Sequence, residues 1–285
     1  MSTLTGRLAL RKAVRLLAAA GISAPARDAR LLLAGALGLA PDRLTLVEGE
    51  ALSPATLARF DEMIAARAST QPVSQILGTR LFWGRAFRVT GDVLDPRPET
   101  EILVACALSR PAPARILDLG TGSGAILLTL LAEWSSATGL GTDVNRAALA
   151  IARTNAAALS LTDRADFIES DWFGGLSGTF DLIVSNPPYI AARDMALLSP
   201  DVRDWEPRSA LTPGPTGLES YLRIARGLSA FLAPAGRALV EIGADQGETV
   251  PKVFREAGFA DVAVETDLDG RPRVVTIHPA DRRAS

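Results

Sequence analysis

A glycine-rich segment between two apolar runs constrains the fold of this chain more than any other feature. The run Arg115-Ile-Leu-Asp-Leu119 suits a buried strand, and the run over residues 125–131 suits a buried helix. Between them lies Gly120-Thr-Gly-Ser-Gly124, whose glycines allow a tight turn and a close approach of the backbone to a ligand. A strand, a glycine turn and a helix in this order begin a nucleotide-binding βαβ unit, so the sequence predicts an α/β fold.

The spacing of these glycines and a later carboxylate indicate which class of ligand the turn can bind. The pattern is G-x-G-x-G rather than the G-x-G-x-x-G of dinucleotide enzymes, and no Lys-Ser/Thr pair follows it, which excludes a phosphate-binding P-loop. Asp143 stands nineteen residues beyond Gly124, at the end of the next apolar run. A carboxylate at the end of a second strand can accept hydrogen bonds from a ribose diol. The pattern therefore favours a nucleoside-containing cofactor and disfavours an NAD dehydrogenase.

A second turn signal follows a later strand. The apolar run over residues 180–185 ends at Asn186-Pro187-Pro188-Tyr189. Two prolines in succession have no backbone N–H to donate and have a restricted φ, so a strand must stop there. The result is a rigid turn that carries an amide, free carbonyls and an aromatic ring. We expect it at the carboxyl edge of the sheet, where ligands of open α/β sheets bind.

Together, the glycine turn, the acid and the proline turn resemble the class I S-adenosylmethionine-dependent methyltransferases, in particular those that methylate amino groups. Further motifs are similar to the release-factor glutamine methyltransferases of the HemK/PrmC family. These motifs lie at residues 71–78, 82–84, 96–101, 171–173, 206–207, 241–243 and 269–273. The resemblance covers roughly residues 70–278, with departures at Gln75 and at Leu94-Asp95, outside the proline turn.

This resemblance implies S-adenosyl-L-methionine as cofactor. It implies that Gly120, Thr121, Gly122, Ser123 and Gly124 surround the methionine portion, that Asp143 binds the ribose, and that Asp171, Trp172 and Asn186 complete the cofactor site. We expect Asp118 to hold backbone N–H groups of the glycine turn. The implied acceptor is the glutamine of the Gly-Gly-Gln motif of class 1 peptide-chain release factors, methylated at N5. We expect the enzyme to be a monomer.

The residues of the proline turn suit the chemistry of an amide acceptor. An amide nitrogen is a poor nucleophile because its lone pair is delocalised into the carbonyl. The side-chain oxygen of Asn186 and the carbonyl of Pro187 can each accept one N–H, while Pro188 keeps Pro187 extended. Tyr189 can pack against the flat amide. We therefore expect Asn186, Pro187, Pro188 and Tyr189 to act by alignment, which is worth effective molarities of order 10⁵ M or more.

Three regions follow from the periodicity of the chain. Residues 1–70 have helical patterns only, and we expect a small helical bundle that docks a protein substrate. Residues 71–96 form a linker with a β-hairpin expected over residues 87–94, turning at Gly91-Asp92. In residues 97–285 strands and helices alternate, which predicts a Rossmann-like, doubly wound, mostly parallel sheet of seven strands. The resemblance implies that this region is the methyltransferase domain and that its last two strands are antiparallel. The expected strands are residues 115–119, 138–143, 165–169, 180–185, 236–242, 261–266 and 273–278.

Composition excludes several other classes of protein. One cysteine, Cys106, and one histidine, His278, cannot form a disulfide framework, a Cys/His zinc site or a cysteine–histidine catalytic pair, and we expect no metal. A net charge of −2 argues against stable nucleic-acid binding, although residues 1–80 hold ten Arg or Lys against six Asp or Glu. No apolar run approaches about 20 residues, so we expect a cytoplasmic protein without a membrane segment.

Other functions stay open on the residues alone. An exocyclic amine of a base in DNA or RNA poses the same alignment problem as a glutamine amide, although we find no basic, target-reading insertion after Tyr189. A glutamine of a ribosomal protein is a second alternative acceptor. A cofactor-binding module without catalysis is a third alternative, but such a module has no need of an amide-aligning turn.

Overall fold

The computed structural model describes residues 4–279, which divide into two compact units. Unit 1 comprises the chain up to Thr79 together with Ser199–Trp205, and unit 2 comprises Arg80–Leu198 and the chain from Glu206 onward. Within residues 4–279 no helix combines the length and the apolar character needed to cross a bilayer.

Unit 1 is all-helical, as predicted. Its helices are α1 (Gly6–Ala19), α2 (Pro25–Leu37), η1 (Pro41–Arg43), α3 (Leu44–Val47), α4 (Pro54–Ala68) and α5 (Val73–Leu77). Ser53 caps α4 by accepting a hydrogen bond from the backbone N–H of Thr56, and Pro54 takes the first helical position. Buried side chains of α1, α2 and α4, among them Leu17, Leu32 and Phe60, form one hydrophobic core.

A segment far away in sequence completes unit 1. Arg67 is buried and ion-paired with Asp28 at 2.7 Å, and its guanidinium also lies 3.5 Å from Asp201. The side-chain amide of Gln75, one of the departures from the family pattern, donates to the carbonyl oxygen of Trp205 at 2.9 Å. These contacts bind Ser199–Trp205 to the bundle, an arrangement that the sequence pattern did not predict.

The β-hairpin lies earlier in the chain than expected. It comprises β1 (Thr79–Phe82) and β2 (Arg85–Arg88), joined by Trp83 and Gly84. Both turn residues have positive φ, 49° and 71°, as a two-residue hairpin turn requires. The prediction of a hairpin over residues 87–94 was therefore wrong, and Gly91-Asp92 forms a turn without paired strands.

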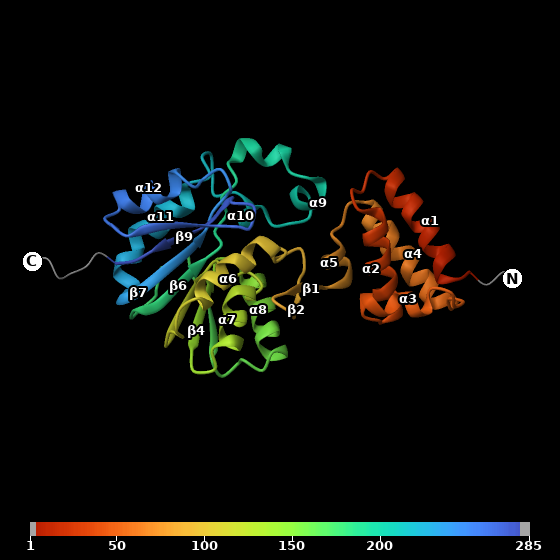
Figure 1. Cartoon of the computed structure of the whole chain (residues 1–285), viewed down its shortest axis with the longest axis horizontal. Coiled ribbons are helices and arrows are strands. Elements are labelled where there is room, and N and C mark those ends of the chain that lie inside the picture. Colours follow the sequence, from red (N-terminus) through yellow and green to blue (C-terminus); the bar gives the residue numbers. More distant parts are fainter. Residues whose placement is uncertain (1–3, 280–285) are drawn as a thin grey trace, which may run out of the picture. The chain divides into compact units, whose positions relative to one another are not determined.

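Unit 2 contains the predicted seven-stranded sheet (Figure 1). The strands are β3 (Arg115–Leu119), β4 (Thr138–Asp143), β5 (Ala165–Glu169), β6 (Phe180–Ser185), β7 (Leu232–Glu241), β8 (Val262–Thr266) and β9 (Pro272–Ile277). Their order is β5-β4-β3-β6-β7-β9-β8. β9 runs antiparallel to both of its neighbours, β7 and β8, and the other neighbouring strands of this sheet are parallel. Most predicted strand boundaries agree within one residue, although β7 begins four residues earlier than expected.

Helices cover both faces of this sheet (Figure 1). One face carries α6 (Glu101–Leu108), α7 (Ala125–Glu133) and α8 (Arg146–Ala158), and the other carries α11 (Glu219–Phe231) and α12 (Thr249–Glu256). Along β6, Leu182 and Val184 join the first core and Ile183 joins the second, because successive side chains of a strand point to opposite faces. The short helices η2 (Pro98–Thr100), η3 (Ala192–Leu197), α9 (Pro200–Arg203) and α10 (Arg208–Leu211) lie in the connections.

The strand order creates a switch point between β3 and β6. From β3 the chain proceeds through β4 to β5 on one side, and then continues from β6 to β7 on the other side. The connections after β3 and β6 therefore leave the sheet in opposite directions and open a crevice at its carboxyl edge. Both turns singled out in the sequence begin at this crevice.

Candidate active site

Strand register brings three predicted site residues to one level. Leu119 of β3 pairs with Thr142 of β4 on one side and with Ser185 of β6 on the other. The next residues along these strands are Gly120, Asp143 and Asn186. They follow paired residues of adjacent parallel strands, so the glycine turn, the carboxylate and the proline turn all meet at the carboxyl edge of the sheet.

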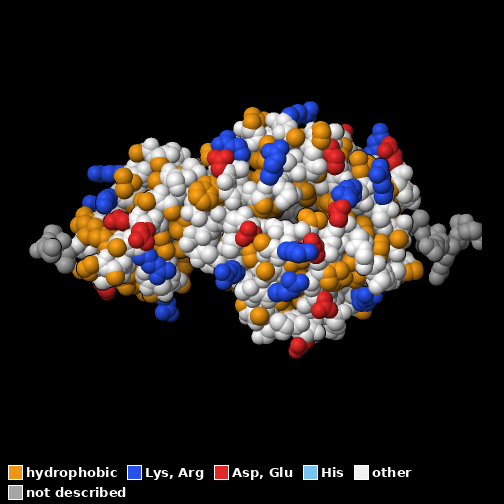
Figure 2. Space-filling model, turned by 180° about the vertical axis from the view of Figure 1, so that it is seen from behind, with side chains coloured by type: hydrophobic (Ala, Val, Ile, Leu, Met, Phe, Trp, Pro, Cys, Tyr) orange, Lys and Arg blue, Asp and Glu red, His pale blue; other side chains and the backbone are white. Residues whose placement is uncertain are grey.

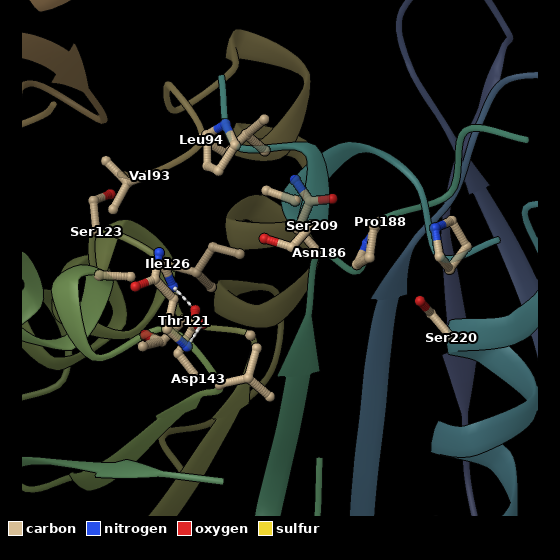
Figure 3. Close-up of a pocket in the computed structure, with 18 of the residues that line it drawn as sticks. Val93, Leu94, Thr121, Ser123, Ile126, Asp143, Asn186, Pro188, Ser209 and Ser220 are labelled. Atoms are coloured by element: carbon tan, nitrogen blue, oxygen red, sulfur yellow. Dashed lines mark hydrogen bonds between the residues drawn. The ribbon is translucent and has the colours of Figure 1, made fainter. Parts of the chain in front are cut away.

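A cavity of about 320 Å³ occupies this edge, and all of its lining residues belong to unit 2. This volume is within the usual range for small-molecule sites. In Figure 3, Thr121 and Asp143 lie on one side and Asn186 and Pro188 on the other. The predicted site residues that line the cavity are Gly120, Thr121, Gly122, Ser123, Asp143, Asp171, Trp172, Asn186 and Pro188. Gly124, Pro187 and Tyr189 are not among the lining residues.

Different positions of the glycine turn require glycine for different reasons. Gly120 and Gly122 have φ of 71° and 55°, and no heavy atom lies within 4 Å of the position that a Cβ would take. This side of the cavity is therefore bare backbone with room for a ligand. Gly124 also has positive φ, but a Cβ there would lie 3.0 Å from Leu128 and 3.3 Å from Ala152. Packing of α7 against α8 requires the third glycine.

Asp143 ties the glycine turn to the end of β4. Its Oδ2 accepts a hydrogen bond from the backbone N–H of Gly122 at 3.0 Å, and its Oδ1 accepts one from Asn145 at 2.9 Å. Burial raises the pKa of this carboxyl above its ordinary value. A carboxylate has about four acceptor positions, so Asp143 can still accept hydrogen bonds from a diol in the cavity.

Asp118 lies beneath the same turn and is fully buried. Its Oδ2 accepts a hydrogen bond from the hydroxyl of Thr121 at 2.7 Å, and burial raises its pKa to about 7. We expected Asp118 to hold the N–H groups of the glycine turn, yet the N–H of Gly122 donates to Asp143 instead. Asp118 thus supports the turn through a side chain.

The proline turn is held from below by buried polar groups. The side-chain Nδ2 of Asn186 donates to the hydroxyl of Thr100 at 3.1 Å, and the carbonyl of Tyr189 accepts from Gln246 at 3.2 Å. The ring of Tyr189 packs against the core beneath α11, and burial raises its pKa to about 12. That ring therefore belongs to the support of the turn, while Asn186 and Pro188 face the cavity.

Asp171 and Trp172 line the cavity after β5. Trp172 has a φ of 57°, which is rare for a bulky residue and is often found at functional sites. Asp171 is exposed and forms an ion pair with Arg223 of α11. This pair joins the loop after β5 to the first turns of α11 across one end of the cavity.

Two further lining residues were not assigned a role from the sequence. Arg97 makes a two-pronged ion pair with Glu206 through Nη2, at 2.6 and 2.7 Å from the carboxylate oxygens. Thr100 lies one helical turn further along the same segment. Both belong to the motifs at residues 96–101 and 206–207, so the signal was present, but only the tertiary structure brings these motifs to the cavity.

Known proteins have sequences similar to this chain. The family model described as "PrmC N-terminal domain" matches residues 9–78, and the one described as "Methyltransferase small domain" matches residues 92–199. The release factor glutamine methyltransferase of Cereibacter sphaeroides is 57% identical over 268 residues, which cover 94% of this chain and 96% of that protein. The protein of the same name from Rhodospirillum rubrum is 44% identical over 98% of this chain and 86% of its own.

The chain belongs to the release factor glutamine methyltransferase family. The predicted family and the predicted type of enzyme, a methyltransferase that depends on S-adenosylmethionine, are thereby confirmed. The groups that line the cavity fit this cofactor, because a bare glycine turn and a carboxylate that can accept hydrogen bonds stand side by side at a cavity of suitable volume.

Solved structures support the fold at much lower identity. The hMettl16 catalytic domain matches with a TM-score of 0.56 and 17% identity, over 78% of this chain and 83% of its own. A methyltransferase from Pyrococcus furiosus matches with a TM-score of 0.52 and 16% identity, over 69% of this chain and 89% of its own. The sheet and its crevice are therefore a methyltransferase fold.

Proposed function

We propose that this enzyme methylates the side-chain amide of a glutamine in a class 1 peptide-chain release factor, at N5 of the glutamine in the Gly-Gly-Gln motif. One observation carries the proposal: Asn186 lines the same cavity as the glycine turn and Asp143. The side-chain amide of Asn186, which can accept a hydrogen bond through its oxygen, thus faces the proposed site of the cofactor. The names of relatives up to 57% identical support a release factor as the substrate.

The proline turn, whose residues Asn186 and Pro188 line the cavity, suits an alignment mechanism. When bound, S-adenosylmethionine supplies an electrophilic methyl group. The side-chain oxygen of Asn186 and the backbone carbonyl of Pro187 each accept one N–H of the glutamine amide, which directs the nitrogen lone pair toward the cofactor site. Pro188 holds Pro187 extended and has no N–H of its own to compete. The rate gain comes from this orientation.

No strong base is needed in this mechanism. The nitrogen becomes acidic once it carries the methyl group, so its proton can leave to water afterwards. The only histidine of the chain, His278, lies 3.0 Å from Asp261 after the end of β9 and is not among the cavity residues. Proton transfer by a histidine is therefore not part of the proposal.

We also propose that unit 1 docks the protein substrate. Its helix α1 exposes Leu8 and Leu16 beside Arg11, Lys12 and Arg15, and these side chains line one depression. Figure 2 shows Lys and Arg side chains next to hydrophobic ones on this unit. Such a surface suits an acidic protein partner with apolar contacts.

Reversing the charges of Arg11 and Arg15 together should raise KM for the protein substrate and leave KM for the cofactor unchanged.

The direct test is transfer of labelled methyl from S-adenosylmethionine to a purified release factor, followed by mass spectrometry of the acceptor. We expect one added methyl on the Gly-Gly-Gln glutamine and none on a release factor whose motif glutamine is replaced by alanine. Duplex DNA, ribosomal RNA and ribosomal proteins serve as competing acceptors. Label on one of these alone would contradict the proposed substrate, and the absence of label on every acceptor would contradict the proposed reaction.

A further inference from the structure

Three side chains in contact form a buried row from the proline turn to the end of β7. The Nδ2 of Asn186 donates to Oγ1 of Thr100 at 3.1 Å. The hydroxyl of Thr100 also faces the Glu241 carboxyl and lowers the pKa of that carboxyl as a hydrogen-bond donor, while Oε2 of Glu241 has no hydrogen-bond partner within the described residues. The three residues come from the turn after β6, from η2 and from the last position of β7. Thr100 and Glu241 are buried, with 4% and 3% exposure. Water therefore cannot replace either partner readily.

When Glu241 is ionised, only one assignment of hydrogen-bond donors and acceptors is possible along this row of three side chains. A carboxylate only accepts hydrogen bonds, so the single hydrogen of the Thr100 hydroxyl must be donated to Glu241. The oxygen of Thr100 is then left to accept, and it needs an N–H from Asn186. The NH₂ group of Asn186 must therefore face Thr100. Its carbonyl oxygen is left for the cavity.

This matters because the two ends of an asparagine amide are nearly the same in shape. Nothing in the size of the side chain prevents it from turning over, so the hydrogen-bond partners decide its orientation. If Asn186 turned over, its NH₂ group would face the NH₂ group of an acceptor amide. Two donors cannot form a hydrogen bond, so the acceptor nitrogen would lose one of its two alignment contacts.

We propose that Thr100 and Glu241 are positioning residues that set the orientation of the Asn186 amide, so that its oxygen faces the acceptor nitrogen. Neither residue takes part in methyl transfer itself. The role in catalysis rests on the proposed function, because it requires an acceptor that carries N–H groups. The orientation of Asn186 itself does not depend on which acceptor is used.

The surroundings of Glu241 connect this orientation to pH. Burial raises the pKa of Glu241 to about 7; the nearby charge of Glu99 also raises it, whereas the hydrogen bond from Thr100 and the positive charges of Arg273 and Arg97 lower it. Tyr189 also faces Glu241 and is neutral at these pH values. Above about pH 7 the carboxylate can only accept. Below it, a protonated Glu241 can donate to Thr100, and the constraint on Asn186 is lost.

Variants of Thr100 and Glu241 test the catalytic consequence. Thr100→Val keeps the shape of the side chain and removes the hydroxyl, and Glu241→Gln introduces a donor that can reverse the donors and acceptors along this row. We expect kcat to fall about 10- to 100-fold in both variants, as for the loss of an orienting contact. KM for the release factor and the Kd of the cofactor should change little. Thr100→Ser keeps the hydroxyl and should restore kcat to within a few-fold of the wild-type value.

The pH profile separates positioning from a merely structural role. In the wild type, kcat should fall as the pH drops through about 7, because Glu241 then gains its proton. Thr100→Val interrupts this row, so this fall should disappear in that variant. Wild-type kcat in Thr100→Val, or failure of Thr100→Ser to restore kcat while it folds and binds cofactor normally, would overturn the proposal.

Neutron diffraction on deuterated crystals of the full chain at pH 8 tests the orientation without any acceptor. We expect deuterium atoms on the Asn186 nitrogen that faces Thr100, and the Thr100 deuteron directed at Glu241. A Thr100 deuteron directed at Asn186 would disprove the inference even if the enzyme methylates release factors. Conversely, failure of the release factor assay would leave this measurement valid, so the two proposals can fail separately.

Discussion

The two sides of the active-site cavity are built in different ways. The side proposed to bind the cofactor is mainly backbone: the glycine turn leaves bare main chain at Gly120 and Gly122, and Asp143 secures it by accepting backbone N–H groups. The side proposed to bind the acceptor is mainly side chains: Asn186 donates to Thr100, and Thr100 faces Glu241. One side depends on residues close together in sequence, and the other depends on three distant segments.

This difference predicts different consequences of substitution. A backbone cradle binds whatever fits its shape, so damage to it should weaken binding. An oriented amide contributes to the transition state only through direction, so damage to it should slow the reaction and leave cofactor binding almost intact. Substitutions on the two sides should therefore separate affinity from rate.

The largest effect is expected at Asn186. Asn186→Ala removes one of the two acceptors that align the glutamine amide, and we expect the single-turnover rate of methyl transfer to fall about 10³-fold or more. Cofactor affinity, measured by calorimetry, should stay within a few-fold of the wild type. A variant with wild-type turnover would rule out the alignment mechanism, and a variant that lost cofactor binding as well would abolish the contrast between the two sides.

A smaller effect of the opposite kind is expected at Asp143. Asp143→Ala removes the acceptor of the Gly122 N–H and the carboxylate proposed to bind the ribose, and the loss of such charged hydrogen bonds should weaken cofactor binding about 10- to 100-fold. The single-turnover rate at saturating cofactor should change much less. Glu169→Ala is the matched control, because Glu169 ends the adjacent strand β5 but does not line the cavity. Equal affinities in the two variants would contradict the assignment of Asp143.

The smallest effect on activity is expected at Asp118, where stability should respond to pH instead. The folded-state pKa of about 7 exceeds the ordinary value of 3.8, so its protonated form stabilises the fold at low pH, and this contribution is lost as the pH rises from about 4 through 7. Asp118→Asn does not titrate and keeps an acceptor for Thr121. Its free energy of unfolding relative to wild type should therefore rise over this window, by at most about 4 kcal/mol.

Urea unfolding of both forms at pH 5 and pH 8 measures this difference. Glu241 is buried too, with a pKa of about 7, so it serves as an internal reference and some decrease of stability with pH should persist in Asp118→Asn. A difference between the two forms that is the same at both pH values would show that Asp118 does not titrate in this range.

Much of the fold followed from local patterns. The strands of the sheet alternate between two cores, and their apolar runs predicted β3, β4, β5 and β6 at the observed residues. The hairpin was misplaced, because Gly91-Asp92 is a common turn pair, whereas Trp83 is a rare residue for a left-handed turn. The early start of β7 was missed because Pro234 and Gly236 weaken a strand pattern.

The sequence by itself determined the class of the fold and the edge of the sheet where the glycine turn, Asp143 and the proline turn meet. It could do so because the glycine turn and Asp143 follow or end consecutive strands, whose carboxyl ends meet at one edge of a parallel sheet. Only the tertiary structure decided that Thr100 and Glu241 lie beneath Asn186, and that Ser199–Trp205 joins the helical unit. Those contacts join residues as much as 141 positions apart in sequence, and a hydrogen bond between such residues leaves no periodicity in the chain.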